Sequence, residues 1–344
     1  MRFSKKFLLI LSILLLVVFS FGCGGDKEKV DDGKIKIGLV FDVGGRGDKS
    51  FNDAAYAGLE RAKQELGIEY EYIEPPSSGG GDREAGLRQL AVKGFPLVFG
   101  IGFMFTNDIN SVAKEFTDTY FACVDYTVNP DIPIPDNVAA LQFKEHEGSF
   151  LVGAMAGLIS KTKKVGFIGG MDIPLIHKFE QGYITGVKTA CPECEVLVGY
   201  AGVTGEAFKN PGKGKELALS QYNSGADIIF HAAGSTGLGL FEAARETDNL
   251  AIGVDSDQYY EAPGYILTSM VKRVDNAVYE VIDELVKGKF TPGLKEFGLE
   301  VDGVGYVYDE NNKDLIPQEV VDKLEEYKAK IVAGEIVVPF ERSN

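Results

Sequence analysis

Acidic side chains stand where the sequence predicts buried strands to end. Asp42 and Asp125 lie at the ends of two such strands, and a third strand ends in Asp255, with Asp257 two residues further on. An ionised carboxylate only accepts hydrogen bonds, so it suits a ligand that presents hydroxyl donors. Asp is also common in solvated turns, which is the simpler explanation for any one of these residues. Three strands that end in this way favour one shared binding site.

The residue types that carry most hydrolytic and metal chemistry are few and dispersed. The three histidines have no partner at catalytic spacing, and four cysteines leave little material for a metal site. The run 45–50 follows a strand and opens a helix, as a dinucleotide-binding loop does, but Asp48 would stand against the pyrophosphate. We therefore expect a protein that is not an enzyme and that has no cofactor or metal.

Two cysteines are close enough in sequence to interact. Cys191-Pro-Glu-Cys194 lies between a predicted helix and a predicted strand, and forms either a local disulfide or two free thiols. A redox motif would place the pair at a helix N-terminus after a strand, and zinc would require a second pair of ligands. Cys123 lies inside an apolar strand and is expected in the core.

An alternating series of strands and helices positions these residues. Continuous apolar strands such as 96–101 indicate burial on both faces, which is typical of parallel sheets covered by helices. The series restarts after residue 143, which predicts an α/β protein with two doubly wound sheets and ligands beyond the carboxyl ends of their strands. The predicted strands are 34–43, 68–73, 95–101, 120–125, 138–143, 164–169, 195–200, 227–232, 250–255 and 304–307, and the predicted helices are 51–65, 83–92, 107–116, 147–159, 176–190, 213–223, 238–246 and 317–332.

Composition limits the partners. The 344 residues suffice for two domains, and 45% apolar with 25% charged residues is ordinary for a globular protein. Lys and Arg number 35 against 51 Asp and Glu, so the net charge is −16 and no basic footprint for a nucleic-acid polymer is present. A small uncharged or cationic ligand remains open.

The first 22 residues have the pattern of an export signal. Arg2, Lys5 and Lys6 precede an apolar run over 7–21, which is shorter than the ~20 residues of a spanning helix. The end of this run, at Cys23, looks like a bacterial lipobox. This resemblance implies that Cys23 is lipidated and that residues 23–33 tether a body to the cell membrane, facing the periplasm or the exterior. The alternative is ordinary cleavage beside a bystander cysteine.

Seven segments in order resemble the basic membrane lipoprotein family, of the purine nucleoside receptor A type, which serves nucleoside ABC importers. The most informative is Gly38–Asn52, with its Gly-Gly-Arg-Gly-Asp-Lys-Ser-Phe-Asn run. The others are 145–157, 164–170, 210–216, 234–239, 253–258 and 267–272. Phe208 stands where relatives often carry another large aromatic residue.

The resemblance implies a type I periplasmic-binding fold whose two lobes close on a ligand. The lobes would comprise 34–143 plus about 273–292, and 144–272 plus about 293–344, with hinge strands near 124–128, 143–145 and 255–270. Phe51 and Phe208 would stack on the two faces of a base, with Asn52 and the Gly234 backbone nearby. Asp42 and Asp125 would come from the first lobe, and either Asp255 or Asp257, with Lys272, would hold the sugar hydroxyls.

The expected function is therefore capture of a nucleoside, most simply a purine nucleoside, and its delivery to an ABC permease with separate ATPase subunits. An acidic cleft would disfavour phosphorylated ligands. Two alternatives remain at this point. The same fold could bind a pentose or another heterocycle, because carboxylates serve free sugars equally well. The chain could also be a surface adhesin that presents Arg46-Gly-Asp48.

Overall fold

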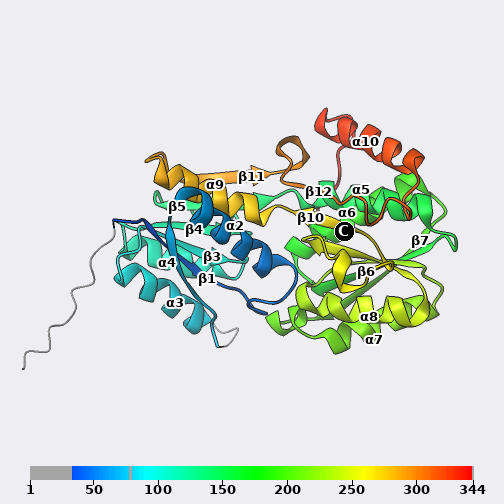
Figure 1. Ribbon diagram of the computed structural model, residues 1–344, viewed down its shortest axis with the longest axis horizontal. Helices are drawn as coiled ribbons and strands as arrows, with labels where there is room; N and C mark the ends of the chain where they lie inside the picture. The colour runs from blue at the N-terminus through cyan, green and yellow to red at the C-terminus, as the bar shows by residue number, and fades with distance from the viewer. Residues whose placement is uncertain (1–32, 77–79, 343–344) are drawn as a thin grey trace, which may run out of the picture. The chain divides into compact units, whose positions relative to one another are not determined.

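The computed structural model describes residues 33–76 and 80–342, whose strands form two six-stranded sheets (Figure 1). The predicted leader, Cys23 and the tether up to residue 32 lie outside the described residues. Within the described ranges, no helix has both the length and the apolar composition needed to cross a bilayer. Helices cover both faces of each sheet, which confirms the predicted α/β class with two doubly wound sheets.

The first sheet is entirely parallel. Its strands are β1 (Lys36–Val40), β2 (Glu69–Ile73), β3 (Leu97–Ile101), β4 (Tyr120–Val124), β5 (Val138–Phe143) and β11 (Gly293–Phe297), and its helices are α2 (Phe51–Leu66), α3 (Gly80–Val92), α4 (Phe105–Glu115) and α9 (Val274–Val286). The strand order is β11-β5-β4-β3-β1-β2. Helices α3 and α4 pack over Val98 and Phe121, whereas α2 and α9 cover the opposite face over Leu39 and Phe99.

The second sheet is parallel except for one edge strand. Its strands are β6 (Lys164–Met171), β7 (Glu195–Gly202), β8 (Ile228–Ala232), β9 (Leu250–Asp255), β10 (Ile266–Lys272) and the antiparallel β12 (Val304–Tyr306). Its helices are α5 (Glu145–Ile159), α6 (Pro174–Ala190), α7 (Pro211–Asn223), α8 (Gly237–Thr247) and α10 (Gln318–Val332), with short 3₁₀ turns η1 (Gly205–Phe208), η2 (Gly234–Thr236), η3 (Tyr259–Glu261) and η4 (Leu299–Val301). Figure 1 shows α7 and α8 together on one face, and α5 and α6 on the other.

The two sheets repeat one strand order. The second sheet runs β12-β10-β9-β8-β6-β7, so β1, β3 and β4 correspond to β6, β8 and β9. Residues that follow corresponding strands therefore occupy corresponding places at the carboxyl edges of the two sheets. Strand-end residues of both sheets line one cavity, as expected for ligand sites beyond the carboxyl ends of parallel strands.

The chain passes between the sheets three times. The passages lie at 143–145 between β5 and α5, at 272–274 between β10 and α9, and at 297–304 between β11 and β12. The hinges predicted at 124–128 and 255–270 are wrong, because these segments connect strands of the same sheet. The predicted lobe boundary also separates β11 from its sheet. This strand pairs with β5 in the first sheet, although residues from about 293 onward were predicted in the second lobe.

Helices α5 and α6 approach each other closely at two glycines. A Cβ on Gly153 of α5 would lie 2.2 Å from the carbonyl oxygen of Tyr183 on α6, and a Cβ on Gly186 would lie 2.0 Å from the carbonyl oxygen of Phe150. Any larger residue at either position would force the helices apart. The wall that α5 and α6 form over the second sheet therefore depends on these positions.

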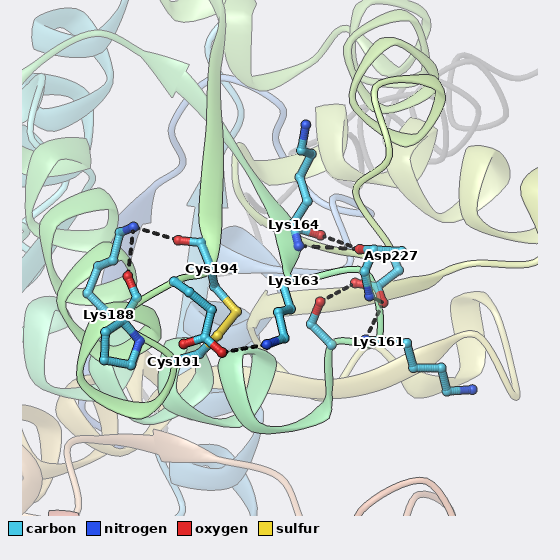
Figure 2. The surroundings of a disulfide bond; sticks show 11 residues. Lys161, Lys163, Lys164, Lys188, Cys191, Cys194 and Asp227 are labelled. Carbon is cyan, nitrogen blue, oxygen red and sulfur yellow. Dashed lines mark hydrogen bonds and ion pairs between the residues drawn. A yellow bond between two sulfur atoms is a disulfide. The ribbon is translucent and has the colours of Figure 1, made fainter.

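A disulfide closes the connection between α6 and β7. The structure joins Cys191 to Cys194, and Figure 2 shows Lys188 of the last helical turn beside this bond. Its ammonium donates to the carbonyl oxygens of Cys194 (2.5 Å) and Pro192 (3.4 Å). A cation at a helix C-terminus is favourable, because the last carbonyls carry partial negative charge. The disulfide lies at the amino end of β7, opposite the carboxyl edge of the sheet.

Candidate functional site

A cavity lies between the carboxyl edges of the two sheets, with about 590 Å³ of empty space that includes its opening to solvent. We call each sheet with its covering helices a lobe, the first lobe holding the β1 sheet and the second the β6 sheet. Residues from both lobes line the cavity, so it is a site between them. Eight of the nine predicted ligand-binding residues are among the lining residues, which are Asp42, Val43, Asp48, Phe51, Asn52, Gly102, Phe103, Asp125, Leu175, Ile176, Phe179, Phe208, Ala232, Ala233, Gly234, Val254, Asp255 and Lys272.

Asp257 is the predicted residue that lies elsewhere. Its carboxylate accepts a hydrogen bond from the Tyr259 backbone amide, and the residue lines a separate polar depression on the surface. The sequence left open whether Asp255 or Asp257 faces inward, and the structure places only Asp255 at the cavity.

Two cavity aspartates occupy corresponding positions in the two lobes. Asp125 directly follows β4, and Asp255 is the last residue of the corresponding strand β9. Both have left-handed backbones, with φ of 61° and 65°. Asp adopts this conformation more readily than most residues, because its short polar side chain bonds locally. The turn redirects the chain at each strand end and leaves a carboxylate at the cavity.

Lys272, at the end of β10, joins the lobes by a buried ion network. Only 2% of the residue is exposed, and its ammonium lies 2.6 Å and 2.7 Å from the two carboxylate oxygens of Asp125. It also lies 3.0 Å from Glu145, which Lys178 contacts at 3.2 Å. Burial alone would lower the pKa of Lys272, but the surrounding carboxylates outweigh it and raise that pKa. A buried ammonium paired in this way remains charged.

Asp42 lies two residues beyond the end of β1 and lines the cavity. Its Oδ1 accepts a hydrogen bond from the Val43 backbone amide at 2.7 Å. A Cβ on Gly102 would lie 1.9 Å from Asp42 Oδ2, and Gly102 itself has φ of 109°, so only glycine fits opposite this carboxyl. Burial raises the pKa of Asp42 to about 7, against the opposing effects of the Val43 bond and Arg83.

Asp255 belongs to the second lobe and is hydrogen-bonded to the first. Ser50, which precedes α2 in the first lobe, donates its hydroxyl to Asp255 Oδ2 at 2.5 Å. Burial raises the pKa of Asp255 to about 7, although Lys272 and the Ser50 hydrogen bond both act in the opposite direction. Two cavity carboxyls, one in each lobe, therefore titrate near neutral pH.

Aromatic side chains from both lobes form the apolar walls. Phe51 is the first residue of α2, and Phe208 ends η1 in the second lobe. Both are half-buried and line the cavity. Phe208 lies over Gly170, where a Cβ would come within 2.2 Å of the phenylalanine ring, and Lys272 stands 5.1 Å from the ring centre of Phe51. The rings of Phe51 and Phe208 thus line the same cavity as the carboxylates.

Further apolar lining residues were missed by sequence analysis. Phe103 follows β3, and Leu175, Ile176 and Phe179 come from the first turns of α6. The strand-end rule that selected Asp42 and Asp125 also applies to Phe103, because its strand ends at Ile101. The α6 residues carry no comparable signal, because an apolar helical face is ordinarily core.

Asn52 and Asp48 position the loop before α2. The Asp48 carboxylate accepts hydrogen bonds from the backbone amides of Ser50, Asn52 and Asp53, and also from the side-chain amide of Asn52. The side-chain oxygen Oδ1 of Asn52 accepts a hydrogen bond from the Asp42 backbone amide at 3.1 Å. Both polar atoms of Asn52 are thus engaged by protein. Only 3% of Asp48 is exposed, so Arg46-Gly-Asp48 is not displayed as a surface tripeptide.

The cavity therefore combines flat apolar walls with hydrogen-bond acceptors and one buried cation. Among the described residues, no three His, Cys, Asp or Glu side chains are arranged to hold a metal. Carboxylates held by their own partners accept hydroxyl donors through charge-assisted bonds, which are stronger than neutral ones. The arrangement suits an uncharged ligand with an aromatic ring system and neighbouring hydroxyls.

Comparison with known proteins gives matches over nearly the whole described chain. A family model described as "ABC transporter substrate-binding protein PnrA-like" matches residues 34–342. The CD4+ T-cell-stimulating antigen of Listeria monocytogenes is 37% identical over 365 residues, covering 98% of this chain and 99% of the relative. An uncharacterized lipoprotein of Pyrococcus abyssi is 37% identical over 361 residues, covering 95% and 87%. Among solved structures, an ABC transporter solute-binding protein of Aeropyrum pernix has a TM-score of 0.81 at 30% identity, covering 89% of this chain and 94% of its own.

Proposed function

The chain belongs to the family of PnrA-like ABC transporter substrate-binding proteins, and we propose that the ligand it captures is a nucleoside. The membership predicted from the seven sequence segments is thereby confirmed, as is the type I periplasmic-binding fold. A protein of this family has a small-molecule ligand and a permease as partners.

The proposal depends most on one feature of the cavity, in which a phenylalanine from each lobe stands beside carboxylates from each lobe. A nucleobase offers a flat face to Phe51 and Phe208, and stacking on an aromatic side chain contributes roughly 1–3 kcal/mol for a base. The ribose offers vicinal hydroxyls, which donate hydrogen bonds to the carboxylates of Asp125 and Asp255. The same carboxylates repel phosphate, so nucleosides are preferred over nucleotides.

The proposed mechanism is capture and delivery, with no bond made or broken. A ligand held by both lobes stabilises the closed form by its greater affinity for that form. The closed protein then docks on an ABC permease, whose ATPase subunits are separate chains. We propose that the protein is lipid-anchored through Cys23 on the outer side of the cell membrane, which the lipoprotein name of the Pyrococcus abyssi relative supports.

The test is a thermal-shift panel that compares nucleosides, free bases, ribose and amino acids. Only nucleosides are expected to raise the melting temperature, because a ligand stabilises the folded state in proportion to the logarithm of its concentration over Kd. Mass spectrometry of ligand carried through purification provides an independent identification. A larger shift with ribose than with nucleosides would replace this proposal with pentose binding, since the carboxylates serve both.

Phe51→Ala and Phe208→Ala identify the stacking residues. Each is expected to weaken nucleoside binding about tenfold or more, from the loss of one stacked ring. Phe290→Ala is the matched control, because this half-buried ring stacks on Tyr120 outside the cavity. Calorimetric titration measures the affinities. Equal affinities in all three variants would show that the rings are only core residues.

A further inference from the structure

Gln258 connects the lobes from a position outside the cavity. It lies in the turn after β9, with 2% of its surface exposed, and is not among the cavity-lining residues. Its side-chain amide donates to the carbonyl oxygen of Lys49 at 2.9 Å. Lys49 belongs to the loop before α2, so this hydrogen bond joins the second lobe to the first.

The second lobe fixes the orientation of this amide. Gln258 Oε1 accepts from the Val254 backbone amide at 2.8 Å and lies 3.0 Å from His231 Nε2. Burial lowers the pKa of His231 to about 4, so the ring is neutral and its Nε2–H is the donor to Oε1. Because Oε1 is held from within the lobe, the NH₂ group must face the first lobe. The Gln258 backbone amide is also held, by Ser269 Oγ at 3.0 Å.

The first lobe presents a prebuilt acceptor. Lys49 has a left-handed backbone, with φ of 57°, and its amide donates to Asp53 at 3.1 Å. Two further hydrogen bonds lie beside this contact. Ser256 Oγ donates to the Ser50 carbonyl oxygen at 3.2 Å, and Ser50 Oγ donates to Asp255. The last bond links the contact to a cavity carboxylate.

We propose that Gln258, assisted by Ser50 and Ser256, is a latch that holds the lobes closed and sets the affinity for a ligand it does not touch. This inference rests on the proposed function. The Gln258 amide is held in place by the second lobe and the Lys49 carbonyl by the first. Few side chains therefore lose conformational freedom when the lobes close, and the hydrogen bonds stabilise the closed form with little entropic cost. Apparent affinity is the intrinsic affinity multiplied by the fraction of molecules that are closed and competent, so a weaker latch raises Kd without any change in the cavity.

The experiment compares Gln258→Met with Gln221→Met in the full chain. Gln221 is a similarly buried amide of the second lobe, but its NH₂ donates to Phe167 within that lobe at 3.0 Å. Spin labels at Val128→Cys in the first lobe and Val203→Cys in the second, both exposed, report the lobe separation without any ligand. Guanosine and adenosine serve as probes of affinity and dissociation rate.

Gln258→Met is expected to reduce the closed fraction of the ligand-free protein and to raise Kd about threefold to tenfold, mainly through faster dissociation. Gln221→Met should lower thermal stability comparably and leave the lobe separation and Kd unchanged. Ser256→Ala, a milder change of the same latch, should shift both readouts in the direction of Gln258→Met. Equal lobe separations in Gln258→Met, Ser256→Ala and wild type would overturn the latch. Failure of wild-type protein to bind any nucleoside overturns the proposed function instead, and the label distances still decide the latch.

Discussion

At the residue scale, the cavity combines one buried ion pair with two carboxyls that titrate near neutral pH. Lys272 and Asp125 form a buried ion pair, whereas Asp42 and Asp255 have pKa values raised to about 7 by burial. The charges of Arg83, Asp125 and Asp48 act on the pKa of Asp42, and those of Lys272, Asp125 and Asp48 act on the pKa of Asp255. The protonation state of the cavity therefore changes across the pH range in which most proteins operate.

Ligand affinity is expected to rise with pH between 6 and 8. An ionised carboxylate accepts hydroxyl donors at both oxygens, whereas a protonated carboxyl carries a donor on one of them, so binding at neutral pH should release protons, with about a tenfold change in Kd for one such carboxyl. Calorimetry in buffers of different ionisation enthalpy measures the protons released. Asp42→Asn and Asp255→Asn should each remove part of this dependence. A Kd that is constant from pH 6 to pH 8 in wild type would contradict the assignment.

The same raised pKa values act on stability with the opposite sign. A carboxyl that titrates near 7 when folded and near 4 when unfolded binds more protons in the folded state between these values. Its contribution to the free energy of unfolding is complete below about pH 4 and is lost as pH rises through about 7. The ligand-free protein gains stability from these two groups on the acid side, where the ligand is expected to bind more weakly.

The cavity aspartates could be predicted from sequence, but the choice between Asp255 and Asp257 could not. Strand ends and acidic residues are both visible in one dimension. Asp255 has a left-handed backbone and is hydrogen-bonded by Ser50, which is remote in sequence, and neither feature is visible in one dimension. The contact of Gln258 with the first lobe could not be predicted, because its partner Lys49 is remote in sequence.

At the element scale, the long apolar strands and amphipathic helices were predictable, and so were β12 and α10 near the end of the chain, whereas the elements between residues 256 and 303 were not. The predicted elements leave a gap between residues 255 and 304, where the structure has β10, α9 and β11. Strand β11 has only five residues, four of them partly or fully exposed, so its own pattern is weak. Its membership in the first sheet results from pairing with β5. The wrong hinges have the same origin, because a connecting loop does not encode which sheet receives it.

The disulfide between α6 and β7 is expected to act on stability alone. Closing so short a loop contributes about 2 kcal/mol in the chain-entropy description. Cys191→Ser combined with Cys194→Ser should lower the free energy of unfolding by about this amount in urea titrations. Nucleoside affinity should not change, because the bond lies at the end of β7 remote from the cavity edge.

Wild-type protein treated with a thiol reductant is the control for the disulfide, because Cys123 is already a free thiol buried in the first sheet. It should lose the same stability as the double variant. A loss of nucleoside affinity in either sample would show that the disulfide positions the cavity.

At the scale of the whole molecule, the proposed lipid anchor would hold the protein at the outer side of the cell membrane. Metabolic labelling with palmitate should mark the wild-type chain, and Cys23→Ala should lose both the label and membrane retention. Cys123→Ala is the matched control, since this thiol is buried and should not affect labelling. Label that persists in Cys23→Ala would remove the anchor from the proposal, and would leave nucleoside capture unaffected.

The threefold passage of the chain between the sheets constrains how the protein can be made. The first sheet lacks its edge strand until residue 297 has been synthesised, and the second lacks β12 until residue 306. Neither lobe is a continuous stretch of chain, so an emerging polypeptide cannot complete one lobe and then begin the other. Such a chain stays incompletely folded until nearly all of it has been synthesised, which would suit the proposed location outside the cell membrane, because an exported chain is threaded through a secretion channel before it folds.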